Sequence, residues 1–306
     1  MKRFLKNTFI FALVFFLLDK LFIFFILTSP QKEADKRLEL LLEGKINKEI
    51  VILGSSRGAR NIIASEIANK TGHSAYNLAY PGSDIDFHEF IARTLLKFNK
   101  APKVVLLSVD YPMALLPDSI LNFRLDRLYP LVKYSYINEE LVNRGEKNII
   151  SSNLFALSRM NKTNFDIKQK QFTSLDTVYA DGSMPISFQK KNEDWTPLET
   201  AIRYDRKKEL KAKVASFKKI VALCQQKNIK LIIIQPPLFD AMDPAFHKRL
   251  AQLTAAKAQF FDYNHQDPIY TNKAYYYDRT HLNRKGAMIF TDEIIDYLKT
   301  NKILEQ

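Results

Sequence analysis

A serine early in the chain and an aspartate-histidine pair near its end have the residue types of a nucleophilic catalytic site. Ser56 ends the sequence Gly-Ser-Ser, and Asp278 precedes His281 by three residues. A carboxylate at that spacing can orient a histidine, and the histidine can then take a proton from a serine hydroxyl. Together the three residues predict a Ser-His-Asp site, in which Ser56 is the nucleophile and His281 the general base.

The same residues also have ordinary structural explanations. Ser55 or Ser56 follows a short apolar run and precedes a helical pattern, where serine is a common N-cap. His281 could lie in a polar loop just before the last helix, for which Asn283 is the expected N-cap. Spacing alone does not choose between these interpretations and catalysis.

Short apolar runs alternate with helical patterns along most of the chain. Continuously apolar strands are typical of a parallel sheet that is covered on both faces. We therefore predict an α/β fold, a three-layer α/β/α sandwich with a central, mostly parallel, doubly wound sheet. The predicted strands are 49–53, 75–79, 104–109, 230–235 and a weaker 258–262, and the predicted helices are 59–70, 87–98, 206–227, 244–256 and 284–300.

Residues 8–29 form an almost unbroken apolar run, long enough to cross a bilayer, which predicts one transmembrane helix before the sheet. Lys2, Arg3 and Lys6 precede it, which favours an N-terminus inside the cell and a main domain outside. A cleaved signal peptide is the alternative, but no small-x-small cleavage pair follows the run. The predicted location is the cytoplasmic membrane, single-pass, with the main domain extracytoplasmic, in the periplasm or at the cell surface.

Asp19 and Lys20 lie near the middle of this run, where each charge would cost about 3 kcal/mol on insertion scales. Two interpretations are open. Either a partner helix or mutual neutralisation compensates the charges, or the helix is tilted or shifted so that they meet water.

The domain prediction has three parts. Residues 1–30 are the membrane anchor, 31–47 a juxtamembrane stalk or helix, and 48–306 the domain that carries the candidate site, with an insertion at about 111–204. The insertion breaks the strand-helix alternation, and it is either a lid or substrate-binding wall, or a surface elaboration.

Composition excludes several other classes of protein. The net charge is +13, but the lysines and arginines are scattered over helical stretches without a base-stacking aromatic pattern, so no nucleic-acid partner is predicted. They suit a solvated helix face, or attraction to anionic lipids or polymers. Cys224 is the single cysteine, which excludes an intrachain disulfide and paired-cysteine metal sites. Glycine-rich nucleotide-binding motifs and His-Glu-x-x-His are missing, so neither a cofactor nor a metal is predicted.

Three segments together resemble the SGNH (GDSL-type) hydrolase superfamily, over about 50–299. They are Gly-Ser-Ser at 54–56, Asn-Leu-Ala-Tyr-Pro-Gly at 77–82 and Asp-x-x-His-Leu-Asn-x-x-Gly at 278–286. The resemblance implies that Ser56, His281 and Asp278 form the triad. It also implies that the backbone N–H groups of Ser56 and Gly82 donate to the oxyanion.

The third block of the family pattern differs. The family commonly has Gly-x-Asn-Asp there, with the Asn as an oxyanion donor, whereas this chain has Ser-Val-Asp-Tyr at 108–111. Asp110 cannot donate when it is ionised. Arg57 is either a substitute donor or a surface charge.

The predicted anchor, the Gly-Ser-Ser turn and the missing Asn are similar to membrane-anchored branches of this superfamily. These include D-alanyl-lipoteichoic acid transfer proteins and alginate O-acetyltransferase proteins. The resemblance implies an extracytoplasmic serine esterase or O-acyltransferase that acts on acetyl or similar acyl esters of a cell-envelope glycan, polymer or lipid. It also implies contact with the membrane through the N-terminal helix and a membrane-bound O-acyltransferase as a partner. The alternative is a catalytically weak or inactive envelope scaffold that binds an anionic polymer or such an acyltransferase.

Overall fold

The structure, a computed structural model, describes residues 1–28, 35–160, 173–188 and 202–305. Contacts divide the chain into two compact units. One comprises Met1–Lys36 and Arg124–Gln171, and the other comprises Arg37–Phe123 and Phe172–Gln306. The sheet and all of the candidate site residues belong to the second unit.

The core of the second unit is a five-stranded sheet in which every neighbouring pair of strands is parallel, as predicted. The strand order is β2-β1-β3-β4-β5, so the winding direction of the chain reverses between β1 and β3. At such a reversal the connections leave in opposite directions, and a crevice opens at the carboxyl ends of the two strands. The strands are β1 (Ile50–Leu53), β2 (Ala75–Asn77), β3 (Val104–Ser108), β4 (Lys230–Ile234) and β5 (Gln259–Phe261).

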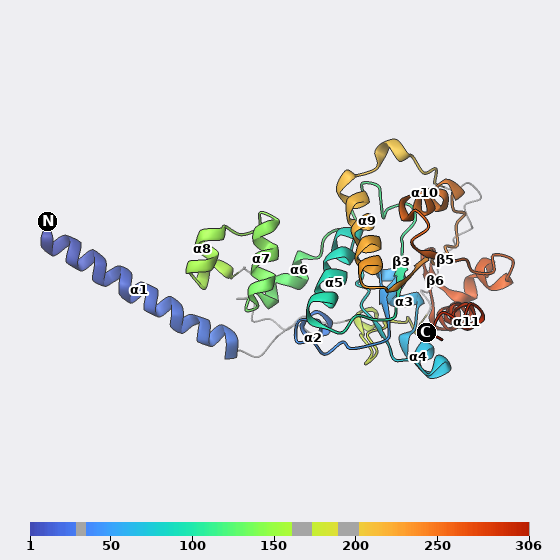
Figure 1. Ribbon diagram of the computed structural model, residues 1–306, viewed down its shortest axis with the longest axis horizontal. Coiled ribbons are helices and arrows are strands. Elements are labelled where there is room, and N and C mark those ends of the chain that lie inside the picture. The colour runs from blue at the N-terminus through green and yellow to red at the C-terminus, as the bar shows by residue number, and fades with distance from the viewer. Residues whose placement is uncertain (29–34, 161–172, 189–201, 306) are drawn as a thin grey trace. The chain divides into compact units, whose positions relative to one another are not determined.

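Helices cover both faces of this sheet, in agreement with the predicted three layers (Figure 1). On one face, α4 and α11 bury apolar side chains against alternate residues of β1, β3 and β4, because successive side chains of a strand point to opposite faces. On the other face, α5 packs against α9 and contacts β1, while α9 contacts β4. The helices of this unit are α2 (Arg37–Leu42), α3 (Ser56–Asn61), α4 (Ala64–Thr71), α5 (Ile85–Phe98), α9 (Lys211–Gln226), α10 (Pro244–Thr254) and α11 (Arg284–Thr300).

The single helix predicted over 59–70 is two helices, α3 and α4, and α3 begins earlier, at Ser56. Ile62 and Ile63 separate them in extended conformation, and both side chains are buried in the core. The Ile63 N–H, which a continuous helix would use internally, donates to Thr291 Oγ1 on α11 at 3.1 Å. Core packing therefore interrupts a pattern that is helical by local sequence.

Shorter elements complete the second unit. The most important for the site is the antiparallel pair of β6 (Tyr276–Asp278) and β7 (His281–Leu282). The others are the 3-10 helices η4 (Ser174–Asp176), η5 (Arg206–Lys208), η6 (Pro268–Thr271) and η7 (Lys273–Tyr275).

The first unit is helical in its described residues and contains part of the predicted insertion. Residues 124–160 of that insertion lie in the first unit, while 111–123, 173–188 and 202–204 lie in the second. The remaining parts of the prediction, 161–172 and 189–201, are outside the described residues, as is 31–34 of the predicted stalk. The elements of the first unit are α1 (Lys2–Thr28), α6 (Leu125–Leu128), η1 (Tyr129–Leu131), α7 (Ser135–Asn143), α8 (Ile149–Leu154) and η2 (Leu157–Arg159).

The prediction of a transmembrane helix is wrong. In the part of the chain that the structure describes, no helix combines the length and the apolar character needed to cross a membrane. Charged groups interrupt the apolar run of α1: the Asp19 carboxylate accepts hydrogen bonds from the N–H groups of Ala156 and Leu157 at 2.8 and 3.0 Å. Lys20 Nζ lies 3.6 Å from the same carboxylate. The single-pass location with an extracytoplasmic main domain, which depended on this helix, is corrected with it.

Candidate active site

The turn that carries Ser56 is pressed against the end of the neighbouring strand. Gly54 follows β1 with φ +150°, and a Cβ atom at this position would lie 2.7 Å from the Cβ of Ser108 at the end of β3. Only glycine has both the backbone freedom and the missing side chain that this approach requires. The turn therefore places Ser56 at the start of α3, at the carboxyl ends of β1 and β3.

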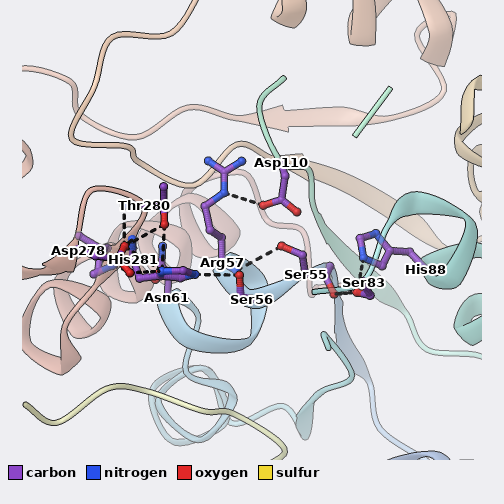
Figure 2. A network of polar contacts seen from close by, with 12 residues as sticks. Ser55, Ser56, Arg57, Asn61, Ser83, His88, Asp110, Asp278, Thr280 and His281 are labelled. Atoms are coloured by element: carbon purple, nitrogen blue, oxygen red, sulfur yellow. Dashed lines mark hydrogen bonds and ion pairs between the residues drawn. The ribbon is translucent and has the colours of Figure 1, made fainter. Parts of the chain in front are cut away.

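The two serines of the turn have different roles. Ser55 is the N-cap of α3, and its hydroxyl accepts from the Arg57 N–H at 3.4 Å. Ser56 Oγ instead lies 2.8 Å from His281 Nε2 (Figure 2). The capping explanation thus applies to Ser55, and Ser56 is the serine that meets the histidine.

The hairpin of β6 and β7 brings the acid and the base together. Asp278 Oδ1 and Oδ2 lie 2.9 and 3.0 Å from His281 Nδ1. Oδ1 also accepts from the Thr280 N–H and hydroxyl, at 2.8 and 2.9 Å, and from the His281 N–H at 2.9 Å. The structure therefore brings Ser56, His281 and Asp278 into one hydrogen-bonded chain, with the carboxylate held by its own turn.

The carboxyl group of Asp278 stays ionised at neutral pH. Burial raises its pKa, but the hydrogen bond and charge of His281, together with the donors of Thr280, outweigh burial and hold the pKa well below 3.8. An ionised carboxylate accepts from the Nδ1–H of the imidazole, which leaves Nε2 as the acceptor for the Ser56 hydroxyl.

Contacts from three other segments fix this hairpin. Arg279, at its tip, pairs with Asp240 in the loop after β4, with nitrogen-oxygen distances of 2.6 and 3.0 Å. The Leu282 N–H donates to Asn61 Oδ1 at the end of α3, at 3.1 Å. Asn283 caps α11 by accepting from the N–H groups of the second and third residues of that helix, which confirms the predicted cap.

Two backbone donors are available for an oxyanion. Among the described residues, neither the Ser56 N–H nor the Gly82 N–H has a hydrogen-bond acceptor. Ser56 is the first residue of α3, where N–H groups have no partner inside the helix and carry partial positive charge. Gly82 has φ +73° in the turn after β2. The structure is compatible with the predicted donor role of both groups, which remains a prediction.

Ser83 connects the two turns that carry these donors. Its hydroxyl lies 3.2 Å from the Gly54 carbonyl and 2.7 Å from the Tyr80 carbonyl, and 2.9 Å from His88 Nε2. Since a serine has one proton and both carbonyls only accept, His88 Nε2 is the donor to Ser83. Burial lowers the pKa of His88 to about 4, despite the opposing charges of Asp110 and Asp86, so the imidazole is neutral at pH 7.

Arg57 is not a surface charge. It is buried, and its Nε donates to Asp110 Oδ1 at 2.6 Å, with the two side chains 5% and 6% exposed. Asp110 follows β3 by two residues, so the pair lies at the carboxyl ends of β1 and β3. The third block therefore holds a buried ion pair where an amide donor was expected.

Four residues that support the site were not predicted from the sequence. Thr280, Ser83, His88 and Asp240 hold the acid, the turns and the hairpin in place. The position of Thr280 between Asp278 and His281 was the one available signal, because Ser83, His88 and Asp240 contact the site through the fold. Within the described residues, no three His, Cys, Asp or Glu side chains form a cluster that could hold a metal ion.

Comparisons with known proteins add little to this geometry. Neither a protein-family model nor a curated protein sequence matches the chain. A solved structure similar to it is a "putative acylhydrolase" from Bacteroides fragilis, at 11% identity and a TM-score of 0.38, covering 89% of this chain and 99% of that chain. At that TM-score the similarity supports no statement on function, so the function proposed below rests on the site alone.

Proposed function

We propose that this chain is a serine-dependent acyl hydrolase or O-acyltransferase. The observation that carries the proposal is the hydrogen-bonded series from Ser56 Oγ to His281 Nε2, at 2.8 Å, and from His281 Nδ1 to Asp278, at 2.9 Å. Direct proton transfer requires a separation of about 3 Å, and the series has it without any rearrangement. A general base that is oriented by a carboxylate is what a serine needs to act as a nucleophile near neutral pH.

The proposed reaction has two halves. Ser56 Oγ attacks the carbonyl carbon of an ester while His281 Nε2 takes the hydroxyl proton. The imidazolium that forms is stabilised by the Asp278 carboxylate, and the oxyanion by the N–H groups of Ser56 and Gly82. When the ester C–O bond breaks, His281 returns the proton to the leaving alkoxide, and an acyl group remains on Ser56.

The second half decides between hydrolysis and transfer. His281 takes a proton from water or from an acceptor hydroxyl, whose oxygen attacks the acyl carbon. The bond from that carbon to Ser56 Oγ then breaks, and His281 returns the proton to Oγ. The order of the motifs that resemble SGNH hydrolases supports esters of acetyl or similar acyl groups as the substrates. Acylated glycans, polymers and lipids are the proposed classes of acyl donor.

Active-site labelling tests the proposal. A fluorophosphonate should label the wild type on Ser56, and Ser56→Ala should abolish the labelling. Ser55→Ala is the matched control, because it removes the neighbouring hydroxyl and a cap worth about 1 kcal/mol but leaves the nucleophile. Labelling that persists in Ser56→Ala would exclude this serine, and a folded wild type without labelling would favour the non-catalytic scaffold.

Turnover distinguishes the two chemical outcomes. p-Nitrophenyl acetate serves as the probe ester, with acetylated oligosaccharides as candidate donors. A rate of product formation that rises with added sugar, together with acetylated sugar in the mass spectrum, identifies transfer. Acetate as the sole product identifies hydrolysis.

A further inference from the structure

The guanidinium group of Arg57 has a carboxylate partner at one nitrogen and no partner at another. Its Nε is 2.6 Å from Asp110 Oδ1. Nη1 is buried and has no hydrogen-bond partner among the described residues. The group is therefore aimed by one carboxylate, and part of its donor capacity is unused.

A buried ion pair with an unpartnered nitrogen contributes little to the stability of the fold. A buried donor without a partner costs about 1 to 3 kcal/mol, and a buried ion pair contributes little more to stability than apolar side chains of similar volume would. A pair that is buried but only partly satisfied is better explained by a ligand that completes its hydrogen bonds.

The position of the pair indicates which ligand that is. Arg57 follows Ser56 directly in α3, and Asp110 follows the neighbouring strand, β3. In the close view, the Arg57 side chain leaves the start of α3 beside the contact of Ser56 with His281, and its Nε faces Asp110 (Figure 2). The guanidinium with the unpartnered nitrogen thus belongs to the residue that directly follows the proposed nucleophile, at the carboxyl ends of β1 and β3.

We propose that Arg57 is a third, side-chain donor to the oxygen of the reacting acyl group, and that Asp110 is the residue that positions it. The inference rests on the proposed serine chemistry. As the Ser56 Oγ–carbon bond forms, the carbonyl π electrons move onto oxygen, and an Arg57 N–H donates to that oxygen. The electrons return when the ester C–O bond breaks, and Arg57 contributes hydrogen bonds alone and transfers no proton.

Asp110 determines when this donor has its effect. Because the carboxylate already balances the charge of Arg57, the pair attracts a neutral carbonyl only weakly. The attraction grows as negative charge develops on the oxygen, so the transition state gains more than the bound substrate. Loss of Arg57 should therefore lower kcat and leave KM nearly unchanged.

The test uses Arg57→Lys, which keeps the charge and can still pair with Asp110, but has no planar fork to reach two oxygens. Loss of one oxyanion donor lowers kcat by about 10²- to 10³-fold in other hydrolases, and a fall of about 10²-fold is expected here. The expected change in KM for p-nitrophenyl acetate is less than about threefold, since the contact forms in the transition state. Arg60→Lys, on the same helix, is the matched control and should keep the wild-type kcat.

A second variant distinguishes a loss of catalysis from a folding defect. Arg57→Gln with Asp110→Asn leaves no unpaired buried charge, so it should remain folded, with kcat lowered as in Arg57→Lys. Asp110→Asn alone should lower kcat. Arg57→Lys should then lower kcat by a smaller factor in the Asp110→Asn protein than in the wild type, because Arg57 is already misplaced there. The rate constant for fluorophosphonate inactivation should fall in parallel with kcat, which a purely structural role would not cause.

The outcomes separate the two proposals. Wild-type kcat in both folded Arg57 variants, with turnover lost in Ser56→Ala, would overturn the role of Arg57 alone. Turnover that persists in Ser56→Ala would overturn the proposed function, and the inference with it. The third outcome is a fall in activity that follows the fall in melting temperature, while KM and the rate constant for fluorophosphonate inactivation per folded molecule stay unchanged. That outcome would show that the pair of Arg57 and Asp110 is structural.

Discussion

Asp278→Asn separates the proposed catalytic role of the acid from its role in the hairpin. Oδ1 of Asp278 accepts from Thr280 and from the His281 backbone and lies 2.9 Å from His281 Nδ1, whereas the one contact of Oδ2 among the described residues is with Nδ1, at 3.0 Å. An asparagine whose carbonyl replaces Oδ1 keeps the bonds of the turn. Its amide group then replaces Oδ2 beside Nδ1, so a donor opposes the Nδ1–H and the negative charge is lost, although the carbonyl at the Oδ1 position stays within 2.9 Å. The imidazole is expected to change to the tautomer with hydrogen on Nε2, which cannot accept the Ser56 proton.

The expected magnitudes follow from this division. With the tautomer reversed and the imidazolium no longer stabilised by a charge, kcat should fall by about 10⁴-fold, or about 5.5 kcal/mol in the barrier. The free energy of unfolding should change by only about 1 to 2 kcal/mol, because the hydrogen bonds that the hairpin needs are kept.

The assay is p-nitrophenyl acetate turnover, with the melting temperature measured on the same preparation. Alanine at position 278 is the matched comparison, because it removes the bonds of the turn as well, and it should lose more stability than asparagine while losing similar activity. A folded Asp278→Asn protein with kcat within about threefold of the wild type would refute the assignment of Asp278 as the orienting acid.

Three further predictions concern parts of the structure around the site. The pKa of His88 in the folded state is about 4, below the ordinary 6.5, so on acidification the unfolded chain takes up the proton first. The contribution of neutral His88 to the free energy of unfolding is therefore complete above pH 6.5 and is lost as pH falls to about 4. The fall in melting temperature over that range should flatten in His88→Gln, and an equally steep fall would contradict the assignment. Gly54→Ala should lower the free energy of unfolding by about 3 kcal/mol or more, because alanine there would have a positive φ and its Cβ would overlap the end of β3. Gly72→Ala is the control, because Gly72 has φ +76° but open space around an added Cβ, and it should lower the free energy of unfolding by about 1 kcal/mol. Urea unfolding measures both variants, and equal losses would argue against the overlap at Gly54. Arg279→Ala removes a partly exposed ion pair with Asp240, so the free energy of unfolding should change by less than about 1 kcal/mol. The kcat should fall by tenfold at most, because the hairpin is only loosened. A complete loss of activity would assign Arg279 a direct role.

The parallel sheet could be predicted because its signals are local. Ile50–Leu53 and Val104–Ser108 are continuously apolar, and that composition reflects burial on both faces of the sheet. Boundaries were less accurate where distant packing competes with local preference. The break between α3 and α4 depends on Thr291, more than 200 positions away, whose hydroxyl takes the Ile63 N–H. The N-terminal helix was misinterpreted because length and apolar content were given more weight than the two charges inside the run.

Spacing within one short segment marked Asp278 and His281 as a candidate pair, because a separation of three residues limits how far apart their side chains can lie. The order of the motifs that resemble SGNH hydrolases then favoured catalysis over a structural role. Local sequence was also enough to mark the Gly-Ser-Ser turn, since a turn between a strand and a helix has a recognisable composition. The local pattern did not separate Ser55 from Ser56, because the contact with His281 joins positions 225 residues apart. Ser56 was predicted from its place two residues after Gly54 in the family pattern. Local sequence could not show that Arg57 is buried against Asp110, for a charged residue on a short helix is exposed unless another strand supplies its partner. Both facts arise from the parallel pairing of β1 and β3, which brings the ends of distant strands into contact and leaves Ser55 as a cap and Ser56 facing the base.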